Sequence, residues 1–572
     1  MTDSSTVESQ PFSTRTLHLV FLLVCGCLLL LPGLAGVGLT DRDEGSNAGA
    51  AREMLETGDW ISPTLNYEPR YAKPAGTYWI TAGIYALFGV NDFTARLQSA
   101  IFGLALIVLQ YLFLHRLLGP APAFCGSLVL LLNVEFVGIH RMVLTDPALV
   151  FFTTLAAYGF WLGFCDSNRN PRFLWMFYLG MALGTLAKGP VGILIPLFGV
   201  VPYLTLTRQW KRYFAEGRPL PGWTLCVLIA APWYLAMLSI HGADYVAAAQ
   251  ANTTGRFANP MEGHGGTLLF YVPVLLLGFF PWSGLLPAAL WQSLKEWRSF
   301  RTGTTDPRGE EGLLLFCALW VSGIFLFFTL SATRLPHYVL PLYPPAALLV
   351  AVLWSRFLKN AWPAGLTVSK RIVLVTGYLF SIGLGSVPLI YANARDQIAV
   401  HFPAAAKIGV GVTPVVLGVL VFLGVVIFRH LVRGEARRPQ AFWVLSGMMG
   451  LFLLVVILFA LPRFGKYFVN PPQELATIAG FNLGPEDTLI HYGRKLPSLT
   501  FYAERKVHFI NPGDHKQFFP HLKKDGRVMV ILPANLRERL PHPVDSFTPV
   551  LQRYGFLLLS RDPMVGGTPA DQ

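Results

Sequence analysis

Long apolar runs recur through the first 461 residues of this chain, and they restrict its fold more than any other feature. Most approach 20 residues, the length that an α-helix needs to cross the hydrocarbon core of a bilayer. Overall, 53% of the residues are hydrophobic and only 13% are charged, about half the charged share of an ordinary soluble domain. Too few polar residues remain to cover a folded surface, which excludes a soluble globular protein, a disordered protein and a nucleic-acid binder.

We therefore predict a mainly α-helical, polytopic membrane protein with about 13 transmembrane helices. The predicted spans are residues 17–39, 97–118, 121–139, 147–164, 173–187, 191–207, 221–240, 267–290, 313–330, 338–357, 372–391, 408–428 and 441–461. The short pair on either side of Lys188-Gly189-Pro190 would also fit a re-entrant hairpin, which leaves the orientation of the later spans unchanged. Segment 17–39 lacks a clear small-residue cleavage site, so we interpret it as a span rather than a signal peptide.

Basic residues predict how the chain is oriented, because loops rich in Lys and Arg stay in the cytoplasm. Most Lys and Arg between the predicted spans fall in one alternating set of loops, of which 208–218 and 429–438 are examples. This asymmetry places the N-terminus in the cytoplasm and the tail after residue 461 outside. The net charge of +13 therefore mainly reflects membrane orientation and says little about partners.

Residues 1–461 are predicted to form the membrane domain, and residues 462–572 differ from them in character. The tail has short β-like runs at 488–492, 507–510, 528–532 and 556–560, separated by polar turns that contain Pro and Gly. It is large enough for a small α/β domain on the outer side of the membrane. No catalytic motif is recognisable in this tail.

The first outer loop, residues 40–94, is far longer than a connection between two spans requires. Residues 45–57 are predicted to form a helix that stops at Gly58, and 78–88 form an apolar, aromatic segment too short to cross a bilayer. We expect both helices to lie in the membrane surface. Polar residues between them would then lie at headgroup depth, where an enzyme acting on lipid phosphates works.

Acidic residues stand at two outer span ends. The sequence Asp41-Arg42-Asp43-Glu44 follows the first span, and Asp146 precedes Pro147 at the start of another. Carboxylates at helix starts also act as simple caps, so each has a structural as well as a catalytic interpretation. Glu135 lies inside an apolar run, where an acid is costly and normally paired or functional, and Arg141 or His140 is its expected partner.

Basic residues are scarce on the outer side, so each is informative. Lys73 lies between the two surface helices, Arg256 lies in the second long outer loop at 241–266, and Lys188 and Arg334 stand at other outer span ends. Taken singly, such residues extend towards lipid headgroups. Several cations that converge with carboxylates at one depth would instead form a binding site for a lipid phosphate.

Cofactor motifs are missing from the sequence. There is no P-loop, no dinucleotide-binding glycine pattern, no HExxH and no serine nucleophile elbow. An outer site also has no access to cytoplasmic nucleotide sugars, so a transferase there needs a lipid-linked donor. Glu262 and His264, or the Asp41 and Asp43 pair, are weak candidates for a divalent cation.

Several motifs resemble one group of proteins, the membrane glycosyltransferases of the GT-C class that use polyprenyl-phosphate sugars. The similar segments are the acids after the first span, Arg-Glu-Met-Leu-x-x-Gly-Asp-Trp at 52–60, Lys73-Pro74 before an aromatic helix, Leu-Thr-Asp-Pro at 144–147, Ala-Lys-Gly-Pro at 187–190 and Arg-Leu-Pro-His-Tyr-Val-Leu-Pro at 334–341. Within this class the chain resembles the bacterial aminoarabinose transferases and their protein O-mannosyltransferase relatives.

The resemblance implies roles for individual residues. It assigns an essential acid to Asp43, with Glu44 and Asp41 as further catalytic candidates, a second acid to Asp146 and a phosphate-binding lysine to Lys73. The predicted lipid-phosphate site also includes Arg256, Arg334, Lys188, Tyr71, His337 and Tyr338. One departure is Ala72, because aminoarabinose transferases often carry an acid directly before the Lys-Pro pair.

The resemblance also implies an activity in the bacterial inner membrane. This activity is transfer of 4-amino-4-deoxy-L-arabinose from undecaprenyl phosphate to a lipid A phosphate, which confers polymyxin resistance. The expected partners are these two lipids, and the expected state is a monomer. One alternative is a related transferase with a protein or glycan acceptor. Another is an anionic-lipid transporter, which predicts broken helices and charges near the bilayer midplane rather than at span ends.

Overall fold

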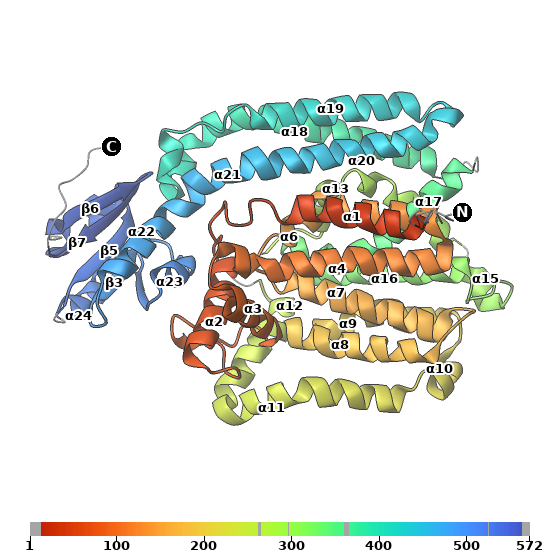
Figure 1. Ribbon diagram of the computed structural model, residues 1–572, viewed down its shortest axis with the longest axis horizontal. Coiled ribbons are helices and arrows are strands. Elements are labelled where there is room, and N and C mark those ends of the chain that lie inside the picture. The colour runs from red at the N-terminus through yellow and green to blue at the C-terminus, as the bar shows by residue number, and fades with distance from the viewer. Residues whose placement is uncertain (1–12, 261–264, 296, 360–364, 524–525, 563–572) are drawn as a thin grey trace, which may run out of the picture.

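The computed structural model describes residues 13–260, 265–295, 297–359, 365–523 and 526–562. A bundle of long helices carries a small α/β domain at one end, and two short helices, α2 and α3, lie between the bundle and this domain (Figure 1). The bundle helices are α1 (Thr14–Leu30), α4 (Asp92–Leu118), α5 (Pro120–Leu131), α7 (Asp146–Phe160), α8 (Leu174–Lys188), α9 (Val191–Leu206), α11 (Pro219–Gln250), α13 (Tyr271–Gly278), α14 (Leu286–Leu294), α16 (Glu310–Leu330), α17 (Tyr343–Leu358), α18 (Leu366–His401), α19 (Thr413–Leu431) and α20 (Arg438–Val455).

The chain is a multi-pass membrane protein. Among the described residues, eight helices are long and apolar enough to cross a membrane, or up to nine if the bent pair Val191–Leu206 and Trp210–Glu216 forms one span. Every segment predicted as a span contains helix, but several of these helices, such as α1 and α5, are short. Segment 267–290 is divided between α13 and α14. The prediction of a helical membrane bundle is confirmed, and the number of thirteen spans stays a prediction.

The C-terminal domain has a five-stranded sheet in the order β4-β3-β5-β7-β6, packed with α22 (Asn470–Asn482) and α23 (Ser498–Ala503). Strands β3 (Thr488–Tyr492), β4 (Val507–Ile510) and β5 (Val528–Pro533) are parallel, whereas β7 (Phe556–Ser560) and β6 (Thr548–Arg553) are antiparallel. The four runs predicted from sequence are confirmed as strands. Strand β6 was not predicted because it is a mostly exposed strand in which only Val550 and Leu551 form an apolar pair. The helical run Glu435–Asn482 passes through residue 461 into this domain.

The two predicted helices of the first loop are present as α2 (Asp43–Thr57) and α3 (Gly76–Phe88). Asp43 and Glu44 stand in the first turn of α2, where carboxylates stabilise the positive end of the helix dipole. Gly58 ends α2 with a left-handed φ of 70°. Most of α2 is buried against α3 and α23, which differs from the expectation that it lies in the membrane surface. The end of α3 does keep large apolar side chains exposed, at Leu87 and Phe88.

Candidate active site

A charged cluster forms where α7, α8 and the segment Pro336–Leu342 meet. Asp146 begins α7 and Lys188 ends α8, and the Lys188 Nζ lies 2.6 Å from the Asp146 Oδ1. Both side chains are buried. Helices α7 and α8 pack closely side by side in opposite directions, so the start of one lies beside the end of the other. Each helix end also favours the charge that it carries.

The Pro336–Leu342 segment adds His337 and Tyr338 to this cluster. The His337 Nε2 lies 3.8 Å from the second oxygen of Asp146. The Lys188 ammonium lies 4.9 Å from the centre of the Tyr338 ring, and Arg256 donates a hydrogen bond of 3.2 Å to the Tyr338 hydroxyl. Arg256 thus joins a set of residues that are far apart in sequence. The structure brings together five of the predicted site residues here.

Lys73 belongs to the same electrostatic cluster. The pKa of Lys73 is lowered to about 7, chiefly by burial and then by repulsion from Lys188 and Arg256, while the charges of Asp146 and Asp43 act in the opposite direction. Three cations therefore share a small region with two carboxylates. An incoming phosphate would offset their mutual repulsion and favour the charged form of Lys73. Such an arrangement is suited to binding a phosphate group.

Asp43 is the acid of the first loop that faces this cluster. Its side chain is exposed at the start of α2, and its charge acts on Lys73. An acid of the first loop thus acts on the basic residues of the cluster, and its carboxylate is accessible to a substrate.

Glu44 is placed differently from its neighbour. Its two oxygens accept five hydrogen bonds, from the guanidinium of Arg96 at 2.8 and 2.9 Å, the amide and hydroxyl of Thr40, and the amide of Val143. Burial alone would raise the pKa of Glu44, but the Arg96 charge and these hydrogen bonds hold it below its ordinary value. A buried carboxylate with its acceptor positions filled has a structural role. The geometry therefore does not support Glu44 as a catalytic group.

Asp41 also points away from the cluster, towards the C-terminal domain. Its two oxygens accept hydrogen bonds of 2.7 Å from the amide and the hydroxyl of Ser498 at the start of α23. Burial raises the pKa of Asp41 to about 6, although the Ser498 hydrogen bonds oppose this shift. A side chain on Gly45 would come within 2.6 Å of the Ser498 backbone, so glycine permits this close contact. Like Glu44, Asp41 anchors the loop.

Further contacts fix the first loop on the C-terminal domain. Arg52 in α2 donates to the carbonyl of Phe501 at 2.6 Å, and the amide of Leu39 donates to the Tyr502 hydroxyl at 2.8 Å. The side chain of Asn66 exchanges two hydrogen bonds with the backbone of Val507 in β4. Through these contacts the C-terminal domain holds α2 and the segment that follows it in place.

Two predicted phosphate ligands, Tyr71 and Arg334, form their hydrogen bonds with residues outside the cluster. The Tyr71 hydroxyl pairs with His241 Nδ1 at 3.1 Å, and His241 also bonds to Ser62 at 2.8 Å. Arg334 donates to the carbonyls of Gly266 and Thr329, which ties down the second outer loop. His241 was missed by the sequence analysis because a single histidine beside an apolar run carries no distinctive signal.

The expected partner of Glu135 was wrong. Glu135, in the short helix α6 (Val134–Ile139), accepts a hydrogen bond from the Tyr343 hydroxyl. Arg141 instead donates to the carbonyls of Leu29 and Pro32, and His140 pairs with a carbonyl of its own helix. Backbone carbonyls at a broken helix end are strong acceptors for a buried guanidinium. Spacing along the chain gave no indication of these partners.

Metal candidates receive little support. Glu262 and His264 lie outside the described residues. Within the residues that the structure describes, no group of three or more His, Cys, Asp and Glu side chains could hold a metal ion. The alternative candidates, Asp41 and Asp43, do not face a common site, because Asp41 accepts a hydrogen bond from Ser498 in the C-terminal domain. No chemical step is therefore assigned to a metal.

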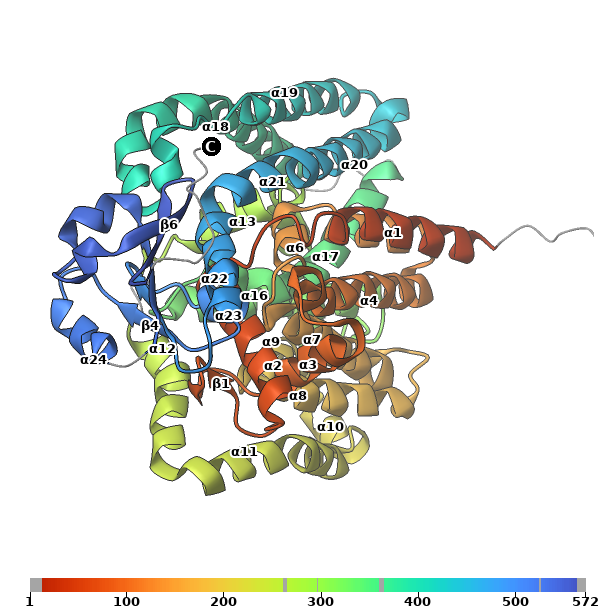
Figure 2. The same cartoon turned by 60° about the vertical axis from the view of Figure 1, so that its left-hand side comes forward.

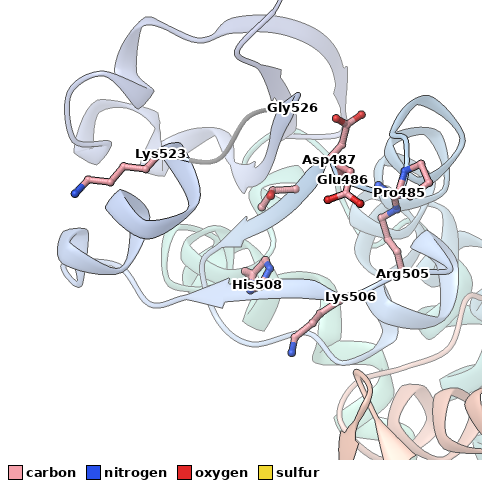
Figure 3. Close-up of a pocket in the computed structure, with 9 residues that line it drawn as sticks. Pro485, Glu486, Asp487, Arg505, Lys506, His508, Lys523 and Gly526 are labelled. Atoms are coloured by element: carbon pink, nitrogen blue, oxygen red, sulfur yellow. The ribbon is translucent and has the colours of Figure 1, made fainter.

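A hollow of about 700 Å³ lies in the C-terminal domain, apart from the charged cluster (Figure 3). It is open, and Asp487, Arg505, Lys506 and His508 are among its lining residues. Two of its basic side chains already have partners, since Lys506 pairs with Glu68 and Arg505 with backbone carbonyls. None of the predicted site residues lines this hollow.

Comparison with known proteins agrees with the fold and the cluster in indicating a membrane glycosyltransferase of the GT-C class. A family model for dolichyl-phosphate-mannose-protein mannosyltransferases matches residues 48–246. The ArnT crystal structure from Cupriavidus metallidurans, bound to undecaprenyl phosphate, shows the same fold with a TM-score of 0.76 and 22% identity, covering 97% of this chain and 99% of that one.

Whole-length relatives define the family more closely. The undecaprenyl phosphate-α-4-amino-4-deoxy-L-arabinose arabinosyl transferase of Edwardsiella ictaluri is 30% identical, over 95% of this chain and 97% of its own. The protein of the same name from Pseudomonas aeruginosa is 28% identical, over 91% of this chain and 94% of its own. The chain belongs to this family of arabinosyl transferases, and it is a glycosyltransferase.

Proposed function

We propose that this protein transfers 4-amino-4-deoxy-L-arabinose from undecaprenyl phosphate to a phosphate of lipid A. The observation that carries the proposal is the cluster in which Lys73, Lys188 and Arg256 share one region with Asp43 and Asp146. It lies at the end of the bundle that bears the C-terminal domain (Figure 1). The names of the relatives support the donor and the sugar.

The expected reaction moves negative charge from the acceptor to the leaving lipid. The donor is a phosphodiester, and the acceptor is a phosphate monoester that is largely dianionic at pH 7 because its second pKa is near 6. An acceptor oxygen attacks the anomeric carbon, and the bond from that carbon to the undecaprenyl phosphate oxygen breaks. Lipid A gains a phosphodiester, and undecaprenyl phosphate leaves with the second charge. A single displacement of this kind inverts the anomeric carbon and needs no covalent carboxylate intermediate.

The residues of the cluster have distinct tasks in this reaction. Lys73 and Arg256 compensate the charge that develops on the departing undecaprenyl phosphate. Asp146 holds Lys188 in place and, with it, the Tyr338 ring. Asp43 orients the acceptor or the amino group of the sugar. Because the acceptor phosphate is already ionised, Asp43 contributes by positioning more than by removing a proton.

The proposed setting is the periplasmic face of the bacterial inner membrane. Loops rich in Lys and Arg lie at the opposite end of the bundle from the C-terminal domain, which supports a cytoplasmic N-terminus and a periplasmic C-terminal domain. One chain supplies every residue of the cluster, so a monomer is sufficient for activity. Transfer of the amino sugar reduces the negative charge of lipid A and thereby its attraction for polymyxin.

Expression in a Gram-negative strain that makes the lipid-linked aminoarabinose donor but lacks its own transferase tests this proposal. Mass spectrometry of extracted lipid A should show an added amino-pentose with the wild type and none with Lys73→Ala. The variant Lys506→Ala, on the C-terminal domain, serves as the matched control and should behave as wild type. An unmodified lipid A, with the wild-type protein present in the membrane, would exclude this acceptor.

A further inference from the structure

Helices α18 and α19 lie side by side (Figure 1 and Figure 2), and they bring several cations together at the end of the bundle opposite the C-terminal domain. Lys370 and Arg371 lie in the first turns of α18, Arg429 lies in the last turn of α19, and Arg433 follows it. The two helices pack against each other along their lengths and run in opposite directions. Because the start of α18 lies beside the end of α19, Lys370, Arg429 and Arg433 are neighbours, and the charges of both arginines repel that of Lys370.

These cations differ from many others at the same end of the molecule. Arg356 pairs with Glu310 and Glu311 at 2.7 and 2.6 Å, Arg212 pairs with Glu216, and Arg438 pairs with Glu435. By contrast, the side chains of Lys370, Arg371, Arg429 and Arg433 make no ion pair within the described part of the chain. The retention of basic loops in the cytoplasm explains the positive charge of these residues. It does not explain why three of them lie together with no ion-paired acid among the residues that the structure describes.

Apolar side chains continue from this cluster along the outside of both helices. On α18, Val375, Leu379 and Ile382 are 57–67% exposed, and on α19, Leu423 and Ile427 are about half exposed. Only 22% of the apolar stretch of α18 and 33% of that of α19 is buried within the protein, compared with 83% for the helix that starts at Asp146. The pair therefore presents lipid-facing apolar surface directly beside a basic cluster.

We propose that Lys370, Arg429 and Arg433 bind the phosphodiester headgroup of an anionic phospholipid, whose acyl chains lie along the exposed faces of α18 and α19. Arg371 lies at the edge of this site. Basic pockets between transmembrane helices at the cytoplasmic surface recognise such headgroups by charge, and the adjacent apolar surface holds the chains. Either phosphatidylglycerol or cardiolipin supplies this chemistry. The site is far from the charged cluster at Lys73 and does not depend on the sugar donor or acceptor.

The test compares two triple variants of the full-length protein in nanodiscs. Lys370→Gln/Arg429→Gln/Arg433→Gln removes the proposed site, and Arg172→Gln/Arg208→Gln/Lys211→Gln removes the same charge elsewhere at the same end. Each protein is reconstituted in phosphatidylcholine alone and with phosphatidylglycerol or cardiolipin at equal phosphate. Bound anionic lipid is then counted by native mass spectrometry, and the thermal midpoint is recorded.

Wild type and the control triple should retain anionic lipid and unfold at a higher temperature in its presence. The site triple should bind it roughly 100-fold more weakly, because each cation at an anionic surface contributes about fivefold. If the site triple does not fold, Arg433→Gln alone should show about a fivefold loss. Equal losses in both triples, or no preference of wild type for anionic lipid, would overturn the proposal. A preference for cardiolipin over phosphatidylglycerol would show that two phosphates occupy the site.

Discussion

The four acids at this candidate site lie in two groups that differ in the partners they contact. Asp41 and Glu44 accept hydrogen bonds from Ser498, Arg96 and backbone amides, and they hold the first loop on the C-terminal domain and on α4. Asp43 and Asp146 instead act on Lys73, the proposed phosphate ligand, and Asp146 also pairs with Lys188. Of the four acids, Asp43 has the side chain that is exposed to a substrate.

This contrast predicts different consequences when each group is altered. Changes at the anchoring acids should lower stability or expression, and activity per folded molecule should follow only indirectly. Changes at Asp43 and Lys73, which are not held in an ion pair among the described residues, should lower activity while the protein stays folded.

Glu44→Gln should have the largest effect, on stability. The substitution leaves the Arg96 guanidinium buried without its counter-charge, which typically costs about 3–5 kcal/mol. Thermal unfolding in detergent, followed by fluorescence-detected size exclusion, should show a strongly lowered midpoint. The double variant Glu44→Gln/Arg96→Met should recover part of the loss. A Glu44→Gln protein of normal stability but without activity would make Glu44 a catalytic group after all.

Lys73→Ala should lower turnover by about 10²–10³-fold, the usual result of removing one preorganised group that stabilises a developing negative charge. Thermal stability should not fall, because burial and neighbouring cations already oppose the charge of Lys73. Turnover is measured on purified protein with the lipid-linked donor and lipid A, and thermal stability is measured on the same samples by thermal unfolding. Activity within a fewfold of wild type would remove Lys73 from the phosphate site.

Asp43→Asn separates two kinds of acceptor. With an ionised phosphate acceptor we expect about a tenfold loss, because positioning is weakened but no base is needed. A hydroxyl acceptor needs a general base, and loss of that base typically costs about 10²–10⁴-fold. Rates of wild type and Asp43→Asn, measured under saturating donor, distinguish the two cases. A loss in the larger range would favour a protein or glycan acceptor.

The pH dependence of donor binding should show the smallest effect. The pKa of Lys73 is lowered to about 7, so the free protein loses this charge as the pH rises through 7 and should bind undecaprenyl phosphate more weakly above it. Lys73→Arg keeps its charge, and its affinity should vary less with pH between 6 and 9. The unfolded chain holds this proton up to its ordinary pKa, so stability of the free protein should rise over the same interval. Identical binding profiles for the two proteins would contradict the assignment.

Much of this site was predictable because its residues lie at recognisable points of the sequence. Asp146 before Pro147 and Lys188 before Gly189 each mark an end of an apolar run, and ends on one side of a membrane lie at one depth. Lys73 before Pro74 lies between the two predicted helices of the first outer loop. The bundle and four of the five strands of the C-terminal sheet were predictable for a similar reason. Both follow from patterns of apolar residues.

The roles of neighbouring acids were not predictable. Asp41, Asp43 and Glu44 look alike in the sequence, and only the partners contributed by α4 and α23 distinguish them. Glu135 was assigned to the wrong partner because Tyr343 is more than 200 residues away. Contacts of this range depend on how the helices pack, which local sequence patterns do not encode.

The most direct test of the central claim uses purified protein, the undecaprenyl-phosphate aminoarabinose donor and two acceptors. One acceptor is lipid A, and the other is the same lipid after enzymatic removal of its phosphates. We expect the amino sugar to appear only on phosphorylated lipid A, with one undecaprenyl phosphate released per sugar transferred. Equal transfer to the dephosphorylated lipid, or turnover that Lys73→Ala leaves unchanged, would contradict this account.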